Sequence, residues 1–176
     1  MVDIVQQLGR ATQDLQLIAI CGRNCQLQEK LGSLKLRNRV FVDGFTQAIP
    51  YYMKLADFFV GKPGPGSISE AIQMKLPVIV ERNAWTLPQE RFNAEWIEQQ
   101  GVGIALKSFR KIAPAVRNLL ASDELREMRE RAARIKNRAV FEIPEILSKL
   151  LDERSRANGS AATSLLSPAA SSPAPE

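Results

Sequence analysis

A glycine-rich turn between an apolar run and a helical pattern is the part of this sequence best suited to chemistry. It reads Gly61-Lys62-Pro63-Gly64-Pro65-Gly66-Ser67-Ile68-Ser69-Glu70. Glycines let a phosphate approach the backbone, and a helix N-terminus offers free N–H groups and partial positive charge, to which Lys62 adds a full charge. Ser67 and Glu70 also fit the S-x-x-E capping box, a purely structural role. Because short glycine-rich matches often arise by chance, the pattern alone favours the structural interpretation.

A second group of polar side chains follows the apolar run Val78–Val80. Gln89, Glu90 and Asn93 fall within one turn of a predicted helix, so their side chains can meet at one place. Amide and carboxylate groups suit the hydroxyls of a sugar, and open α/β sheets bind ligands just past the carboxyl ends of their strands. Spacing alone nevertheless favours an exposed polar helix face.

The sequence contains no histidine, and its two cysteines are Cys21 and Cys25. The missing histidine excludes Ser-His and Cys-His catalytic pairs, and two cysteines alone cannot complete a zinc site or a disulfide framework. Proton transfer therefore needs carboxylates, lysine, tyrosine or a partner. We expect no metal, and the sequence identifies no catalytic residue.

Short apolar runs alternate with helical patterns along the chain. Five runs are predicted strands, namely Leu17–Cys21, Val40–Val42, Phe58–Val60, Val78–Val80 and Gly103–Leu106. The predicted helices between and after them are Gln26–Leu34, Ala48–Leu55, Ser67–Met74, Gln89–Gln99 and Ile112–Ala121. Continuous apolar runs are typical of strands buried on both faces of a parallel sheet. The order predicts an α/β fold with a Rossmann-like, doubly wound parallel sheet.

The two ends of the chain depart from this alternation. Ile4, Val5, Leu8 and Ala11 form a helical stripe with no strand before it, so the usual first strand and its phosphate loop are missing. Near the other end we predict a helix capped by Ser122 and a last one from Pro144, with Ile146, Leu147, Leu150 and Leu151 on one stripe. We place one domain at residues 1–155 and a disordered Ser/Ala/Pro-rich tail at 156–176.

The net charge of +5 and the pI near 9.5 fit nucleic acid, an anionic membrane surface or a phosphate-bearing small molecule. The few aromatic residues do not interleave with Arg and Lys, so we expect no nucleic-acid partner. A basic cluster, Lys107, Arg110, Lys111 and Arg117, is compatible with anionic lipid, although a solvated helix face explains it better. No long apolar run or leader pattern is present, so we expect a cytoplasmic chain.

Several separated motifs together resemble one family. They are Ile18–Asn24, Asp43–Thr46, Ala56-Asp57, Gly61–Ala71, Leu76-Pro77 and Pro88–Ala94. Their order and spacing resemble the C-terminal, donor-binding domain of GT-B glycosyltransferases of the monogalactosyldiacylglycerol synthase, processive diacylglycerol glucosyltransferase and peptidoglycan N-acetylglucosaminyl transferase type. The resemblance covers roughly Asp3 to Leu151 and is far more specific than a single glycine turn.

In that family the C-terminal half binds a UDP-sugar, which here would be a substrate and not a cofactor. The resemblance implies that Glu70 binds the ribose, that Gly44 and Phe45 lie against the uracil, and that Lys62 is near the diphosphate. It implies a diphosphate cradle at Gly64, Gly66, Ser67 and Ile68, and donor-sugar contacts from Gln89, Glu90 and Asn93. Arg23 and Asn24 are candidates for the cleft, although Asn24 also fits a helix cap.

The resemblance implies transfer of a hexose or N-acetylhexosamine from a UDP-sugar, with inversion, to an acceptor that is expected to be a lipid. Family members hold the acceptor in an N-terminal half, so we expect a truncated gene, a misassigned start or a separate partner that supplies it. The enzyme would work in the cytoplasm or peripherally on the inner face of a membrane. One alternative is a non-catalytic nucleotide-binding or interaction remnant, and another, disfavoured by the missing half, is a UDP-sugar epimerase.

Overall fold

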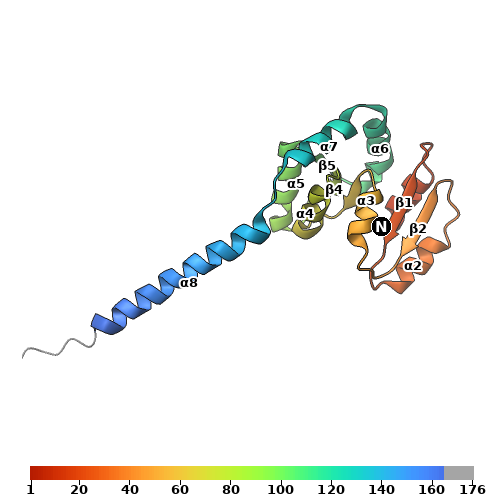
Figure 1. Cartoon of the computed structure of the whole chain (residues 1–176). Coiled ribbons are helices and arrows are strands. Elements are labelled where there is room, and N and C mark those ends of the chain that lie inside the picture. The colour runs from red at the N-terminus through yellow and green to blue at the C-terminus, as the bar shows by residue number, and fades with distance from the viewer. Residues whose placement is uncertain (165–176) are drawn as a thin grey trace, which may run out of the picture. The chain divides into compact units, whose positions relative to one another are not determined.

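A computed structural model describes the backbone of residues 1–164 and the side chains of these residues except 139, 140 and 155–164. Contacts divide the chain into two units, Met1–Lys136 and Asn137–Glu176, which we describe separately. The strands of the described residues all lie in the first unit (Figure 1).

The first unit contains parallel strands only. They are β1 (Gln16–Ile20), β2 (Arg39–Asp43), β3 (Phe59–Gly61), β4 (Val78–Glu81) and β5 (Gly103–Leu106). Within the described residues they form one sheet of order β1-β2 and another of order β3-β4-β5. Gln16 lies opposite Arg39 in the first, and Val78 lies between Phe59 and Gly103 in the second. The five predicted strands are therefore confirmed, each to within a residue at either end.

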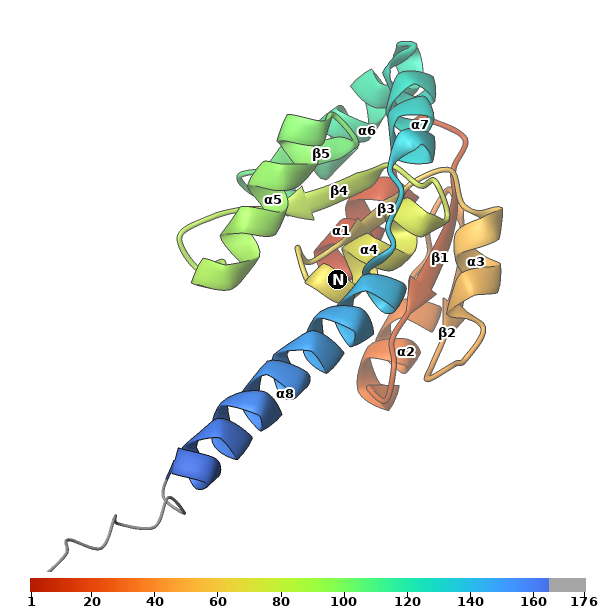
Figure 2. The ribbon, with the colours of Figure 1, turned by 60° about the vertical axis from the view of Figure 1, so that its left-hand side comes forward.

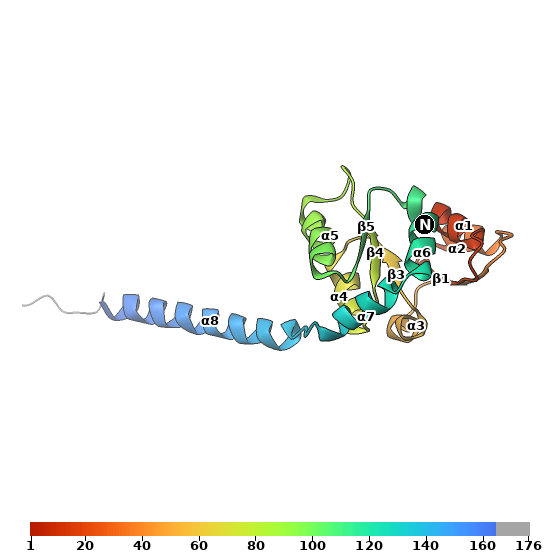
Figure 3. The same ribbon diagram turned by 90° about the horizontal axis from the view of Figure 1, so that it is seen from above.

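Helices connect the strands and cover them. They are α1 (Val2–Gly9), α2 (Cys25–Gly32), α3 (Ile49–Leu55), α4 (Pro65–Gln73), α5 (Pro88–Gln100), the short 3-10 helix η1 (Phe109–Lys111), α6 (Ile112–Ala121) and α7 (Glu124–Arg134). Seen from above, α5 lies on one side of β3, β4 and β5, and α1 and α6 lie on the other (Figure 3). This is the doubly wound α/β arrangement that the sequence predicts.

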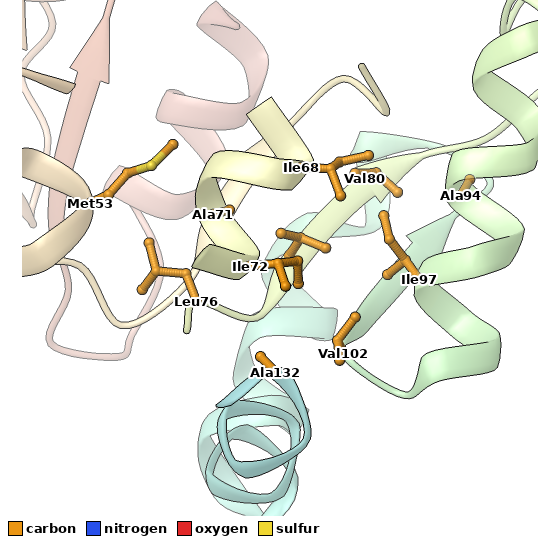
Figure 4. Packing of buried hydrophobic residues seen from close by; sticks show 11 residues of the cluster. Met53, Ile68, Ala71, Ile72, Leu76, Val80, Ala94, Ile97, Val102 and Ala132 are labelled. Carbon is orange, nitrogen blue, oxygen red and sulfur yellow. The ribbon is translucent and has the colours of Figure 1, made fainter. Parts of the chain in front are cut away.

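Strand β4 shows why the sequence has continuous apolar runs. Val78 and Val80 pack on one face with side chains of α4 and α5, including Ile72 and Ile97 (Figure 4). Ile79 points to the opposite face, where it joins a separate cluster with Leu8 of α1 and residues of α6. Successive side chains of a strand point to opposite faces, so a strand covered on both sides must be apolar at every position.

The β1-β2 sheet is covered less evenly. Ala19 packs beside Val5 of α1 and Leu31 of α2 on one face. On the other face Ile18 and its pairing partner Phe41 are 38% and 54% exposed. Helix α1 therefore contributes to both sheets, through Val5 on one and Leu8 on the other.

Helix α7 begins where the sequence predicts, but its N-cap residue is not the predicted one. Ser122 ends α6, and Asp123 takes the N-cap position of α7 without a side-chain hydrogen bond. The Ser122 hydroxyl still accepts a hydrogen bond from the Glu124 N–H at 3.4 Å. The two helices follow each other so closely that Ser122 serves the end of one and the start of the next.

The second unit, as far as it is described, is the helix α8 (Ala139–Ser164). It begins before the predicted start at Pro144, which lies inside the helix and leaves one backbone carbonyl without its helical donor. The domain end predicted at residue 155 therefore differs from the boundary after Lys136, at which contacts divide the chain. Residues 156–164 are helical where we predict a disordered tail, and their three alanines favour helix. Residues 165–176 of that tail lie outside the described residues.

Candidate functional site

The candidate residues lie where four parallel strands end. Arg23 follows β1, Phe45 follows β2, Lys62 follows β3, and the segment leading to Gln89 follows β4. In Figure 2 the connections that leave β3 and β4 lead into α4 and α5. Carboxyl ends of parallel strands meet at one edge of a sheet, the edge at which open α/β sheets bind ligands.

The start of α4 has the features of an anion site. Pro65 is its first residue and has no N–H to satisfy, while Ile68 is the first residue whose N–H bonds back, to the Gly64 carbonyl at 3.2 Å. The N–H groups of Gly66 and Ser67 belong to the first turn, where a helix has no internal partner for them. These two donors and the exposed Lys62 side chain offer positive charge to a phosphate.

Two predictions for this helix need correction. Ser67 and Glu70 form no capping box, because α4 begins at Pro65 and Gly64 is its N-cap. The Ser67 hydroxyl donates instead to the Gly64 carbonyl at 3.2 Å. Ile68 is buried in the core and its N–H is already bonded, so neither its side chain nor its backbone donor is available to a diphosphate. Proline at the first helical position starts the helix two residues earlier than we predict. This earlier start explains both the missing capping box and the hydrogen-bonded Ile68 N–H.

Asn93 connects the second group of polar side chains to the first. Its side-chain amide on α5 donates to the Pro63 carbonyl at 2.9 Å and so ties α5 to the glycine-rich turn. Gln89 lies one turn before Asn93 and is exposed, and Glu90 is partly buried. Asn93 therefore positions the glycine-rich turn. Within the described residues, no side-chain hydrogen bond or ion pair occupies Gln89 or Glu90, so both side chains can contact a ligand.

The loop between β4 and α5 is held by its own hydrogen bonds. The Thr86 hydroxyl accepts from the Asn83 N–H at 2.9 Å, and the Asn83 carboxamide oxygen accepts from the Trp85 N–H at 2.9 Å. Arg91 donates to the Thr86 carbonyl at 3.1 Å, and a further ion pair joins Arg82 to Glu95. The start of α5, with Gln89 and Glu90, is thus presented on an ordered turn.

The ends of β1 and β2 meet through Arg23 and Phe45. The Arg23 guanidinium carbon lies 4.9 Å from the centre of the Phe45 ring, a cation–π contact. Gly22 has a φ of +57°, and a side chain on Gly44 would come within 3.0 Å of the Gln28 amide oxygen. Phe45 is 65% exposed, so its ring can receive a planar base.

Two neighbours of this contact have structural roles. Asn24 is the N-cap of α2 and accepts the Leu27 N–H at 2.9 Å, so the capping interpretation is confirmed. The Asp43 carboxylate accepts from the Tyr52 hydroxyl at 2.7 Å and from the Gly44 N–H at 2.8 Å. The hydrogen bond to Asp43 raises the pKa of Tyr52, so Tyr52 stays a neutral donor. Asp43 belongs to the Asp43–Thr46 motif, but the sequence did not indicate its hydrogen bonds to Tyr52 and Gly44.

The structure brings the candidate residues together in two groups. The first group consists of Arg23, Gly44 and Phe45. The second consists of Lys62, Gly64, Gly66, Ser67, Gln89, Glu90 and Asn93. Glu70 is exposed further along α4. Within residues 1–164, as far as their side chains are described, no hydrogen bond or ion pair joins the two groups. A pocket of about 330 Å³ lies elsewhere, lined by Asp3, Gln6, Gln7, Arg10 and Arg110.

Other site types find little support in the described part of the chain. Its Cys, Asp and Glu side chains nowhere gather in a group of three or more that could hold a metal ion. Burial raises the pKa of the Cys21 thiol, and the nearby Asp43 charge raises it further, so this cysteine is a weak nucleophile. No described helix is long and apolar enough to cross a membrane.

Parallel strands with a glycine turn and helix start at their carboxyl ends define a nucleotide-binding type of α/β domain. Residues 2–150 match the family model described as glycosyltransferase family 28 C-terminal domain, and the chain belongs to this family.

Two curated relatives are much longer than this chain. Monogalactosyldiacylglycerol synthase 1 of Arabidopsis thaliana is 36% identical over 152 residues, which cover 85% of this chain and 28% of that protein. The processive diacylglycerol beta-glucosyltransferase of Bacillus subtilis is 30% identical over 113 residues, which cover 62% of this chain and 29% of that protein. The chain thus spans less than a third of the length of these relatives.

A solved structure supports the fold. WaaG, a glycosyltransferase involved in lipopolysaccharide biosynthesis, superposes with a TM-score of 0.51 at 19% identity, over 73% of this chain and 36% of that one. The comparison confirms the predicted α/β class with parallel strands.

Proposed function

We propose that this chain is the donor-binding part of a glycosyltransferase that transfers a hexose or N-acetylhexosamine from a UDP-sugar with inversion. The observation that carries the proposal is the start of α4, where the first-turn N–H groups of Gly66 and Ser67 follow an exposed Lys62 in a turn that Asn93 holds through the Pro63 carbonyl. Donors of this kind stabilise the diphosphate as it leaves, without a covalent intermediate. Membership of family 28 supports this function over a non-catalytic remnant.

Each remaining part of the UDP-sugar has candidate contacts. Phe45 receives the uracil with Arg23 behind its ring, and the adjacent Gly44 lies against the base as well. Glu70, exposed on α4, accepts the ribose hydroxyls. Gln89 and Glu90 at the start of α5 meet the sugar. No metal or cofactor enters this proposal.

The acceptor in this proposal is a lipid, because the two curated relatives are named for diacylglycerol products or substrates. A base must remove the proton of the acceptor hydroxyl from hydrogen-bond distance. The sequence holds no histidine, and we propose that the base and the acceptor site belong to an N-terminal-half domain or protein. A cytoplasmic position, peripheral on the inner face of an anionic membrane, is part of the same proposal.

Sugar transfer tests the proposal directly. Radiolabelled UDP-glucose, UDP-galactose and UDP-N-acetylglucosamine are offered with diacylglycerol or membrane lipid extract, with and without an N-terminal-half protein. We expect transfer only when both halves are present. Transfer by the chain alone would refute the division of labour, and no transfer by the two halves together would refute the transferase assignment for this pair.

A further inference from the structure

Strand β2 has an unpaired edge on the side away from β1. Its sheet consists of β1 and β2 within residues 1–164, so no described strand bonds that side of β2. The unpaired edge of a strand presents a row of N–H and C=O groups with which another chain can pair. Which chain fits depends on the residues that line the edge.

The backbone groups of Val40 and Val42 point to this edge. The Cys21 N–H, just after β1, bonds to the Asp43 carbonyl at 2.8 Å, so the backbone of Asp43 faces β1. Successive residues of a strand direct their backbone groups to alternate sides, so Phe41 faces β1 as well. Val40 and Val42 alternate with these positions and therefore offer their N–H and C=O groups outward.

The sequence of β2, Arg39-Val40-Phe41-Val42-Asp43, is complementary to itself in reverse. We propose that two copies of the chain associate through this edge, with their β2 strands antiparallel and Phe41 on the two-fold axis. Val40 of each copy then forms a hydrogen-bonded pair with Val42 of the second copy. Arg39 lies opposite Asp43 of the second copy, so opposite charges meet at both ends of the pair. An interface of this kind is isologous and closes at two copies.

The side chains on one face of β2 are available for this contact. Phe41 is 54% exposed, and Arg39 is exposed and forms no ion pair with any side chain that the structure describes. The Asp43 carboxylate accepts from the Tyr52 hydroxyl and the Gly44 N–H, which leaves about two of its four acceptor positions open. In the proposed register, Phe41 with Phe41 and Arg39 with Asp43 are non-hydrogen-bonded pairs, whose side chains approach most closely.

Two hydrogen bonds within the chain favour this register over its neighbours. Moving the centre one residue toward the N-terminus would require the Asn38 N–H to bond the second copy, but that N–H already bonds the Gly9 carbonyl at 2.9 Å. Moving it one residue toward the C-terminus would require the Gly44 N–H, which already bonds the Asp43 carboxylate at 2.8 Å. The centre at Phe41 uses neither of these donors.

The exposed apolar surface extends beyond the strand. The ring of Phe41 lies 5.8 Å, centre to centre, from that of Tyr52 on α3, and Tyr52 lies 5.8 Å from Tyr51. Tyr51 and Leu55 of the same helix are 61% and 59% exposed. Because two paired strands alone are only marginally stable in water, these side chains add apolar area that association can bury.

Sedimentation of the full chain over a range of concentrations tests the proposal. We expect a monomer–dimer equilibrium. Arg39→Glu places two like-charge contacts where two ion pairs stood, so the dissociation constant rises about tenfold or more. Lys107→Glu is the matched control, because it makes the same charge change on an exposed side chain beyond β5, in the other sheet. It changes the constant about twofold at most, through the net charge alone.

Disulfide trapping tests the register. All variants carry Cys25→Ser, since Cys25 is exposed and Cys21 is buried. Phe41→Cys places two thiols at the two-fold axis, with Cα atoms about 4.5 Å apart, within the disulfide range of about 4.4 to 6.8 Å. Arg39→Cys is the control, because its two copies lie about 14 Å apart along the ladder. With diamide as the oxidant, Phe41→Cys forms the covalent dimer at least about tenfold faster than Arg39→Cys.

Three results would overturn the proposal. The first is a chain that stays monomeric at every concentration. The second is a dimer that Arg39→Glu weakens no more than Lys107→Glu does, which would place the contact elsewhere on the chain. The third is disulfide formation at equal rates by Phe41→Cys and Arg39→Cys. None of these readouts depends on nucleotide binding, so their failure is distinct from failure of the proposed function.

Discussion

Replacing Glu70 with glutamine separates a ligand-binding role from a structural one. The Glu70 side chain is exposed on α4, and among the described residues it accepts no hydrogen bond and forms no ion pair. Since α4 begins at Pro65, Glu70 lies beyond the first turn and closes no capping box. The substitution keeps the size and helix propensity of the side chain and removes its charge.

The expected magnitudes differ for folding and binding. The free energy of unfolding changes by about 0.5 kcal/mol or less, as for a surface substitution without partners. Binding of UDP loses about 1.5 to 3 kcal/mol if the carboxylate accepts ribose hydroxyls, the usual range for hydrogen bonds to a charged group. That loss corresponds to roughly tenfold to 150-fold weaker affinity.

Calorimetry with UDP and urea denaturation measure the two quantities on the same preparation. Glu98→Gln, on an exposed carboxylate of α5, is the matched control, because it removes the same charge away from the candidate site. It leaves the affinity unchanged. If Glu70→Gln binds UDP as tightly as the unmodified chain, the assignment of Glu70 to the ribose is wrong, whatever happens to stability.

Two further substitutions probe the two groups of candidate residues, one in each group. Asn93→Ala removes the hydrogen bond to the Pro63 carbonyl, so we expect a loss of about 1 kcal/mol in unfolding free energy together with weaker UDP binding, and a stability loss alone would exclude a positioning role. Phe45→Ala removes the ring that lies over Arg23, so calorimetry should show UDP, ADP and CDP binding more nearly alike, and an unchanged preference would place the base elsewhere.

The fold could be predicted from the sequence because its strands are apolar at successive positions. Val78, Ile79 and Val80 are nearly fully buried, with side chains on both faces of the sheet. A run of this kind can only be a covered strand or a buried helix, and its short length decides for the strand.

Helix starts were predicted less well. Pro65 and Pro88 each begin a helix at a residue that we assigned to the turn, and the shift at Pro65 changes the role of Ser67. The composition of residues 156–176 predicts a disordered tail, whereas α8 extends to Ser164.

Side-chain contacts across the sheet could not be predicted at all. Asn93 and Pro63 are 30 residues apart, and nothing in the spacing indicates that the one donates to the other. The contact of Arg23 with Phe45 joins two strand ends in the same way. Such contacts depend on how neighbouring strand ends are placed, which the local sequence pattern does not encode.

The measurement that tests the central claim most directly is calorimetric titration of the full chain with UDP, ADP and CDP under one condition. A donor site at the carboxyl ends of the strands predicts weak binding, with UDP tighter than both other nucleotides, because Phe45 meets the base while the start of α4 meets the phosphates. Equal affinity for the three nucleotides, or no binding of UDP, would contradict a uridine-diphosphate site in this chain.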